Sequence, residues 1–120
     1  MKTTKTMPMS DDILKTDIMV NAHIRIAARE GVPITVRRRG DSSSGTIVLK
    51  INRLDGTADV LTQIRYEDER VWNPVSPGGP MPETEADRYL DRQAKIDPDS
   101  WLLEIEDRQG RHWFPGRVMK

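Results

Sequence analysis

The densest group of basic side chains in this 120-residue sequence is the run Arg37-Arg38-Arg39. Because successive residues of a strand point to opposite faces, Arg37 and Arg39 would share one face. Guanidinium groups bind phosphate oxygens through paired hydrogen bonds, and Lys50 and Arg53 would lie on the next strand and turn. These five residues predict a site for phosphate or nucleic acid. The competing interpretation is a solvated sheet face whose arginines pair with acidic side chains.

The sharpest acidic cluster comprises Glu104, Glu106 and Asp107. On a strand, Glu104 and Glu106 would share a face about 7 Å apart. Such carboxylates hold magnesium or manganese when three oxygens converge, and His112 would lie across a predicted hairpin from them. These four residues therefore predict, as a further alternative, a metal-dependent hydrolase. The competing interpretation is a set of cross-strand ion pairs, each contributing less than about 1 kcal/mol.

Complete catalytic motifs are missing from the sequence. It has no phosphate-binding loop, no dinucleotide fingerprint and no zinc-protease helix. The run Gly40-Asp-Ser-Ser-Ser-Gly45 is one residue too long for a nucleophile elbow and lies between two expected strands. The absence of cysteine excludes disulfides, thiolate metal sites, iron–sulfur clusters and cysteine nucleophiles. We therefore predict no catalytic residue and no cofactor, and favour a protein that is not an enzyme.

The charge balance and the hydropathy pattern limit the partners. The sequence has 19 basic and 19 acidic residues, so its formal net charge is zero, which argues against a general polyanion binder. No apolar stretch approaches the roughly 20 residues that a membrane helix needs, and the first ten residues lack the apolar run of a signal peptide. We therefore predict a soluble cytoplasmic protein that does not bind membranes.

These candidate residues must be positioned by elements that the periodicity of the sequence predicts. We expect helices at 11–30 and 83–96, and strands at 34–38, 46–53, 58–66, 70–75, 101–106 and 111–114. The strands from 34 to 75 are typical of an antiparallel meander. The prediction is a single α+β domain at 13–116, with an antiparallel sheet of about five to six strands and two helices packed on it. Its length allows one core of two layers.

The remaining segments complete the expected organisation. Residues 1–12 are predicted to be disordered, and residues 76–82, rich in proline and glycine, to be a flexible connector. In the first helix, Leu14, Ile18, Ala22 and Ile26 recur every four residues and predict one apolar stripe. Val20 lies off this stripe, which indicates that a second side of the helix is covered.

Four motifs in order give the sequence a family resemblance. They are Leu14-Lys-Thr-Asp-Ile-Met-Val, the Arg-Arg-Gly-Asp before Ser42, Lys50-Ile-Asn-Arg-Leu-Asp-Gly56, and Asp97-Pro-Asp-Ser-Trp101 running into Glu104-Ile-Glu-Asp-Arg-Gln-Gly-Arg-His112. Over about residues 14–114 the chain resembles the small bacterial domain-of-unknown-function family 1491. That family has no assigned activity, so the resemblance supplies no catalytic residues. It implies that residues 1–13 lie outside the common core and that the connector at 76–82 varies in length.

The function that these observations favour is a small bacterial module that binds an unknown protein partner or forms a homodimer. The reason is that the candidate catalytic groups are dispersed along the sequence, whereas a sheet of several strands leaves edges that can pair with another chain. The phosphate or nucleic-acid site at Arg37–Arg39 and the metal-dependent hydrolase at Glu104–Asp107 remain the alternatives, with nucleic acid a less favoured partner.

Overall fold

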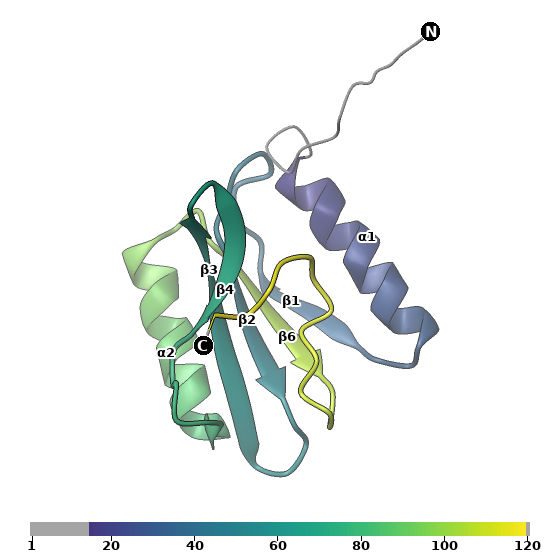
Figure 1. The fold of residues 1–120 in the computed structure, drawn as a ribbon, viewed down its shortest axis with the longest axis vertical. Coiled ribbons are helices and arrows are strands. Elements are labelled where there is room, and N and C mark those ends of the chain that lie inside the picture. Colours follow the sequence, from purple (N-terminus) through teal and green to yellow (C-terminus); the bar gives the residue numbers. More distant parts are fainter. Residues whose placement is uncertain (1–14, 120) are drawn as a thin grey trace, which may run out of the picture.

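The computed structural model describes residues 15–119, which contain two helices and six strands joined by turns and loops (Figure 1). In chain order they are α1 (Thr16–Arg29), β1 (Ile34–Arg38), β2 (Ile47–Asn52), β3 (Thr57–Tyr66), β4 (Glu69–Pro74), β5 (Met81–Pro82), α2 (Glu83–Ile96) and β6 (Trp101–Glu106). The bounds predicted for α2 and β6 are confirmed. The strand predicted at 111–114 is wrong, because Trp113 has a φ of 65°, which a strand does not allow.

The strands form one mixed sheet in the order β1-β6-β2-β3-β4, and β5 pairs with the start of β3. β2, β3 and β4 form the predicted antiparallel meander. The prediction is wrong for β1, because β6 lies between β1 and β2, antiparallel to β1 and parallel to β2. Parallel neighbours need a long connection, which here includes β3, β4 and α2. The fold is thus a single α+β domain with a mostly antiparallel sheet.

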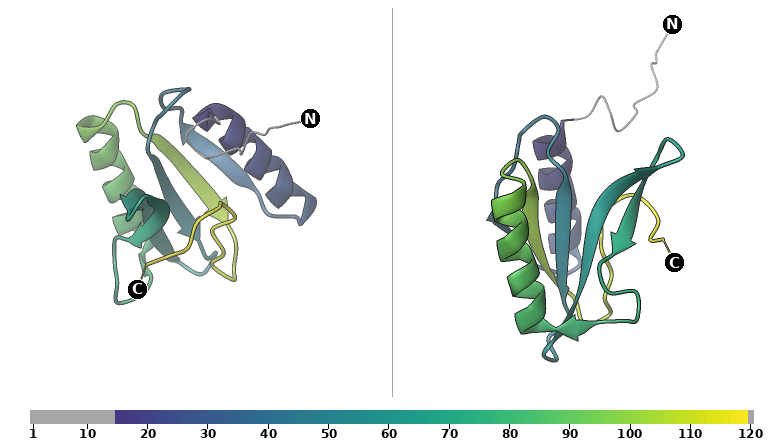
Figure 2. Two further views of the ribbon diagram at one scale, coloured as in Figure 1. Left: turned by 45° about the horizontal axis from the view of Figure 1, so that its top comes forward. Right: turned by 90° about the vertical axis from the view of Figure 1, so that its left-hand side faces the viewer.

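The two helices cover opposite faces of this sheet (Figure 2). The core on the α1 face includes Met19, Val20, Ala27, Ile47, Leu49, Ile51, Trp72, Trp101, Leu103, Ile105 and Phe114. The core on the α2 face comprises Val48, Ala58, Val60, Ala86, Leu90 and Leu102. All six residues of β2 are buried, because this central strand is covered on both faces. The predicted core of two layers is therefore wrong, since the domain has three layers.

The side of α1 that packs on the sheet differs from the predicted stripe. Met19, Val20 and Ala27 are buried against the sheet, whereas Ile18 is 53% exposed and Ile26 is 44% exposed. Both sides of this helix are apolar, so helical periodicity alone could not identify the buried one. The contacts with the sheet decide it.

Three expectations concern the ends and connections of the chain. The segment predicted to be disordered, 1–12, lies outside the described residues. Of the predicted connector at 76–82, Met81 and Pro82 form β5, and the flexibility of the remainder stays a prediction. Within residues 15–119, neither helix is long and apolar enough to cross a membrane.

Candidate functional site

Lys50 is at the centre of a buried ionic network between β2 and α2. The residue is 1% exposed, and its Nζ lies 2.8 Å from Glu83 Oε2, 2.7 Å from Asp87 Oδ1 and 3.3 Å from Glu104 Oε2. Glu83 and Asp87 are four positions apart on α2, so they share a helix face. Burial lowers the pKa of Lys50, but the hydrogen bonds to Asp87 and Glu83 and the nearby Glu104 charge together raise it by more. Lys50 is therefore charged at neutral pH and links α2 to the sheet.

Arg37 and Asn52 complete this network. Arg37 Nη1 donates to Asp87 Oδ1 at 2.7 Å and to Glu104 Oε1 at 3.4 Å. The hydrogen bond to Asp87 raises the pKa of Arg37. Asn52 Nδ2 donates to Glu83 at 3.0 Å and to Glu104 at 3.1 Å. The structure thus brings two of the predicted anion-binding residues together, but both already face carboxylates.

The other three predicted anion-binding residues lie apart from this network. Arg38 donates to three backbone carbonyls, one in the last turn of α2 at 2.9 Å and two just beyond its end at 3.4 and 2.7 Å, where a cation also interacts favourably with the helix dipole. Arg39 places its guanidinium 5.0 Å from the ring centre of Trp101. Arg53 Nε donates to Asp59 Oδ2 at 2.8 Å. The five residues therefore do not form one surface, and anion binding by them stays a prediction.

The acidic cluster predicted as a metal site is divided between two surroundings. Glu104 belongs to the Lys50 network, and Glu106 shares its face of β6 by strand alternation. Asp107 is buried on another side and accepts hydrogen bonds at 2.8 Å from Arg111 Nε and Trp113 Nε1. Burial raises the pKa of Asp107, but these bonds lower it by more, so the carboxylate stays ionised.

His112, the fourth predicted metal ligand, packs beside an aromatic ring instead of joining the carboxylates. Its ring centre lies 5.8 Å from that of Trp72. Burial lowers the pKa of His112, so the imidazole is neutral at pH 7. In the part of the chain that the structure describes, no group of three or more histidine, aspartate or glutamate residues is placed to hold a metal ion. The metal-site hypothesis therefore stays a prediction without a cluster to support it.

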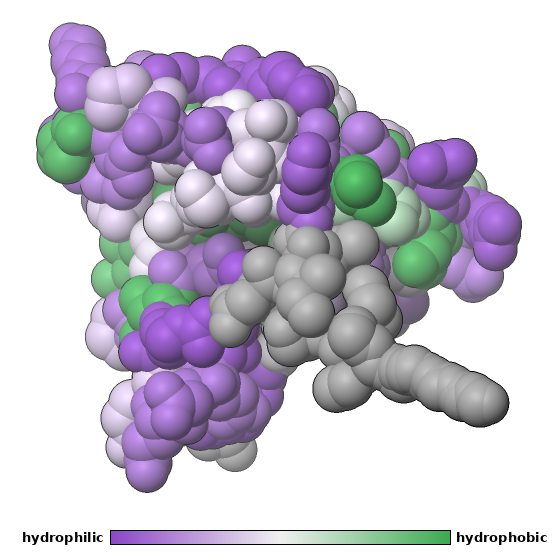
Figure 3. All heavy atoms as spheres, turned by 90° about the horizontal axis from the view of Figure 1, so that it is seen from above, coloured by the Kyte–Doolittle hydropathy of each residue, from purple (hydrophilic) through white to green (hydrophobic). Residues whose placement is uncertain are grey.

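The side of α1 that faces away from the sheet combines apolar and basic residues. We call this surface the outer face of α1; it comprises Ile18, Ala22, Arg25, Ile26 and Arg29. Neither arginine pairs with a carboxylate within residues 15–119, and both are exposed. Figure 3 shows the molecule from the end where α1 begins. The surface is mostly hydrophilic there, and some of its separate hydrophobic patches lie on the side of α1.

Both edges of the sheet are protected against pairing with another strand. At the β1 edge, the register with β6 shifts between Val36 and Arg38, and such a bulge disfavours addition of a further strand. At the β4 edge, Val118 forms a parallel bridge with Trp72. Both features disfavour addition of a further strand at the sheet edges that the sequence suggested as an interaction surface, and interaction through these edges stays a prediction.

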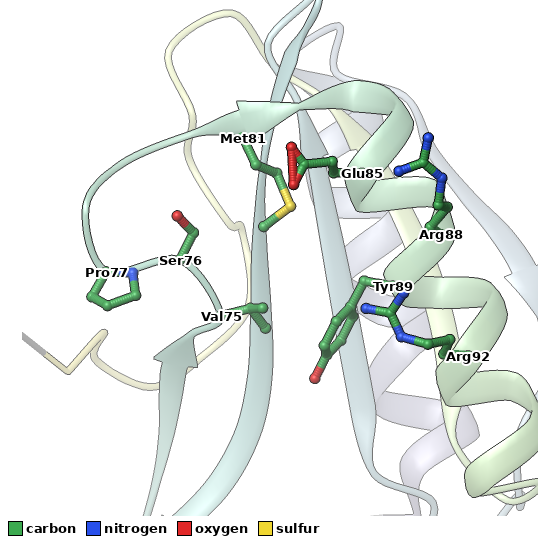
Figure 4. Close-up of a pocket in the computed structure, with 8 residues that line it drawn as sticks. All are labelled: Val75, Ser76, Pro77, Met81, Glu85, Arg88, Tyr89 and Arg92. Atoms are coloured by element: carbon green, nitrogen blue, oxygen red, sulfur yellow. The ribbon is translucent and has the colours of Figure 1, made fainter.

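Among the cavities that open on the surface of the described residues, two bear on the candidate sites. The larger, of about 390 Å³, lies between α2 and the segment that joins β4 to β5 (Figure 4). Tyr89 of α2 and Met81 of β5 line it, and the guanidinium of Arg92 lies 5.8 Å from the ring centre of Tyr89. No feature of the sequence singled out these residues, because the cavity depends on how α2 sits against the preceding segment.

A second cavity, of about 250 Å³, is lined by Arg53, Asp59 and His112 together with aliphatic side chains. Arg53 and His112 were predicted for two different sites, and the structure brings them to one. Asp59 was not predicted at all. No local signal could have found this group, because its members come from β3 and from two loops far apart in the chain.

Comparison with known proteins places the chain in a family. No curated protein matches it. A crystal structure of a DUF1491 family protein from Caulobacter crescentus is 40% identical, covers 89% of this chain and all of its own, and superposes with a TM-score of 0.80. An NMR structure of a DUF1491 family protein from the same organism is also 40% identical, with 90% and 98% coverage and a TM-score of 0.77.

A solution structure of a protein from A. tumefaciens shows the same fold at 24% identity, with a TM-score of 0.65 and coverage of 78% of this chain and 85% of that one. The family model for a protein of unknown function, DUF1491, matches residues 14–115, which include almost all of the described domain. The chain therefore belongs to the DUF1491 family.

Proposed function

We propose that this protein is a non-enzymatic interaction module, and that the outer face of α1 binds a protein partner with an acidic, partly apolar surface. The observation that carries the proposal is the exposure of Ile18 and Ile26 beside Arg25 and Arg29. Apolar side chains that gather on a surface mark interaction sites more often than isolated ones do. The two arginines supply positive charge that a complementary partner would neutralise.

An acidic partner fits this surface better than a second copy of the chain. Two copies that met through α1 with their two-fold axis near Arg25 and Arg29 would bring these residues close to the same residues of the partner copy, and like charges across an interface are unfavourable. The bulge in β1 disfavours the other symmetric route, in which two sheets join edge to edge.

A membrane surface is a poorer fit for the same face. Helices that lie in a membrane interface carry a broad apolar side, with tryptophan, phenylalanine or leucine. The outer face of α1 has two isoleucines and one alanine, and no aromatic residue. Elsewhere in the domain, Lys50 and Asp107 are engaged in structural ion pairs with neighbouring charged side chains. This further supports a role other than catalysis.

The test uses a synthetic amphipathic helix as the probe, with a leucine ridge flanked by glutamates, and a matched peptide in which lysines replace the glutamates. Binding is followed by the amide shifts of the ¹⁵N-labelled full chain. We expect the acidic peptide to shift the amides of α1 and the lysine peptide to leave them unchanged. The double variant Arg25→Glu/Arg29→Glu should reverse this preference, and Arg88→Glu on α2 should leave it as it is.

Four results would overturn the proposal. They are a preference that survives the charge reversal, shifts that fall outside α1, the absence of binding by either peptide, and binding that Ile18→Glu leaves unchanged. Sedimentation of the protein alone as a dimer that Ile18→Glu dissociates would assign the face to self-association. Binding to anionic phospholipid vesicles without binding to the acidic peptide would assign it to a membrane.

A further inference from the structure

The cavity of about 250 Å³ lies where two loops meet β3 and the segment that follows β4, on a part of the molecule other than the outer face of α1. One loop is the turn between β2 and β3, and the other follows β6. The backbone N–H of Asp107 donates to the carbonyl of Asn52 at 3.0 Å, which holds the two loops side by side. Ile51, Leu61 and Val118 are among the aliphatic residues that line the cavity.

Arg53 is held in place at this cavity by two features. Its Nε donates to Asp59 Oδ2 at 2.8 Å, and its guanidinium lies directly against Gly110. A side chain at Gly110 would overlap the guanidinium, and Gly110 has a φ of 72°, which favours glycine. Within residues 15–119 the hydrogen bonds of Arg53 involve Nε alone, so Nη1 and Nη2 remain available as donors to a ligand.

His112 offers a second donor at the same cavity. Its Nδ1 accepts the backbone N–H of Phe114 at 3.3 Å, so the neutral ring carries its proton on Nε2. Nε2 has no hydrogen-bond partner within the described residues. It is not one of their buried unpaired polar atoms either, so it is accessible from the surface. The cavity thus combines aliphatic walls with N–H donors from two fixed side chains, which is the usual composition of a small-molecule site.

We propose that this cavity binds a small organic carboxylate, whose oxygens accept hydrogen bonds from Arg53 and His112 and whose apolar body packs on the aliphatic lining. A guanidinium matches the planar carboxylate through two parallel hydrogen bonds. Asp59 carries a negative charge beside Arg53, which disfavours a doubly charged phosphate more than a singly charged carboxylate. The volume corresponds to about eight waters, so the ligand is of roughly that number of non-hydrogen atoms.

The experiment titrates the ¹⁵N-labelled full chain with benzoate, benzyl alcohol and inorganic phosphate as separate probes. Benzoate should give saturable shifts at Gly110 and at the Arg53 Nε–H. Arg53→Gln should weaken benzoate binding about ten- to hundredfold, the loss expected for a hydrogen bond to a charged group. The matched control Arg88→Gln, at the larger cavity, should bind benzoate as the wild type does.

A second variant keeps the test informative if Arg53→Gln disturbs the fold. Val118 is partly exposed, so Val118→Phe should be tolerated, reduce the cavity and abolish benzoate binding without changing either donor. The proposal is overturned if benzoate gives no saturable shift, if benzyl alcohol binds equally well, or if phosphate binds more tightly. It is also overturned if neither variant weakens benzoate binding.

Discussion

Replacing Lys50 with methionine tests whether the buried ionic network stabilises the domain. Methionine preserves most of the aliphatic volume of lysine, so the change chiefly removes the ammonium. Two charge-assisted hydrogen bonds are lost, those to Glu83 at 2.8 Å and to Asp87 at 2.7 Å. Each such bond contributes about 1.5–3 kcal/mol, but both acidic side chains are more than a third exposed, so water compensates part of the loss.

We therefore expect Lys50→Met to lower the free energy of unfolding by about 2–4 kcal/mol and the melting temperature by about 10–20 °C. Urea unfolding at pH 7, followed by tryptophan fluorescence, measures this directly, because Trp72 and Trp101 are each 1% exposed and become solvated on unfolding. Lys95→Met, at the exposed end of α2, is the control and should change the free energy by less than about 0.5 kcal/mol.

The dependence of this effect on pH separates charge from packing. Burial raises the pKa of Asp87, but hydrogen bonds from Lys50 and Arg37 lower it by more. The stability that a lowered carboxyl pKa supplies is complete above the unfolded value of about 3.9 and is lost as the pH falls through the folded value. The gap between the wild type and Lys50→Met should therefore narrow below about pH 4. A variant as stable as the wild type at pH 7, or a gap that does not narrow in acid, would refute the reasoning.

Three further substitutions test other parts of the structure by urea unfolding. Asp107→Asn should cost about 1–3 kcal/mol, because an amide cannot accept all the N–H groups that the carboxylate accepts; unchanged stability would contradict this. Gly40→Ala should cost more than about 1 kcal/mol, because its Cβ would overlap the backbone of Asp99, whereas Gly78→Ala, with open space around it, should not; equal effects would count against the packing described here. Burial lowers the pKa of His112, so the wild type loses stability as the pH falls from 6.5, the ordinary value, towards the folded pKa of this residue. His112→Gln should remove that part of the pH dependence of the free energy of unfolding. Equal pH dependence in the variant and the wild type would disprove this.

Local signals in the sequence predicted those elements whose formation depends on neighbours along the chain. The apolar spacing from 83 to 96 and the proline at 98 predicted the bounds of α2, and the alternation from 101 to 106 predicted β6. The strand predicted at 46–53 contains Ile47, Leu49 and Ile51 at alternate positions, and the structure places all three in the core on the α1 face. These predictions needed no knowledge of the rest of the molecule.

Pairing between distant strands depended on tertiary structure, and this limited the prediction of the fold. The insertion of β6 between β1 and β2 joins residues such as Ile47 and Trp101, whose partnership no local pattern records. The burial side of α1 was equally undetermined, because two of its sides are apolar and only contact with the sheet selects between them. Trp113 looked like a strand residue by type, but its positive φ ended the predicted hairpin.

For the candidate sites too, some features were determined by the sequence and others by the tertiary structure. The sequence alone determined which side chains are available, namely the three consecutive arginines, the acidic cluster of β6 and the absence of cysteine. Only the tertiary structure decided what they face: it engaged Arg37 and Lys50 with carboxylates, and it brought Arg53 and His112 to one cavity. Residue types and their spacing are properties of the chain, whereas the distance between two charges far apart in sequence is determined by the order in which the strands pair in the folded sheet.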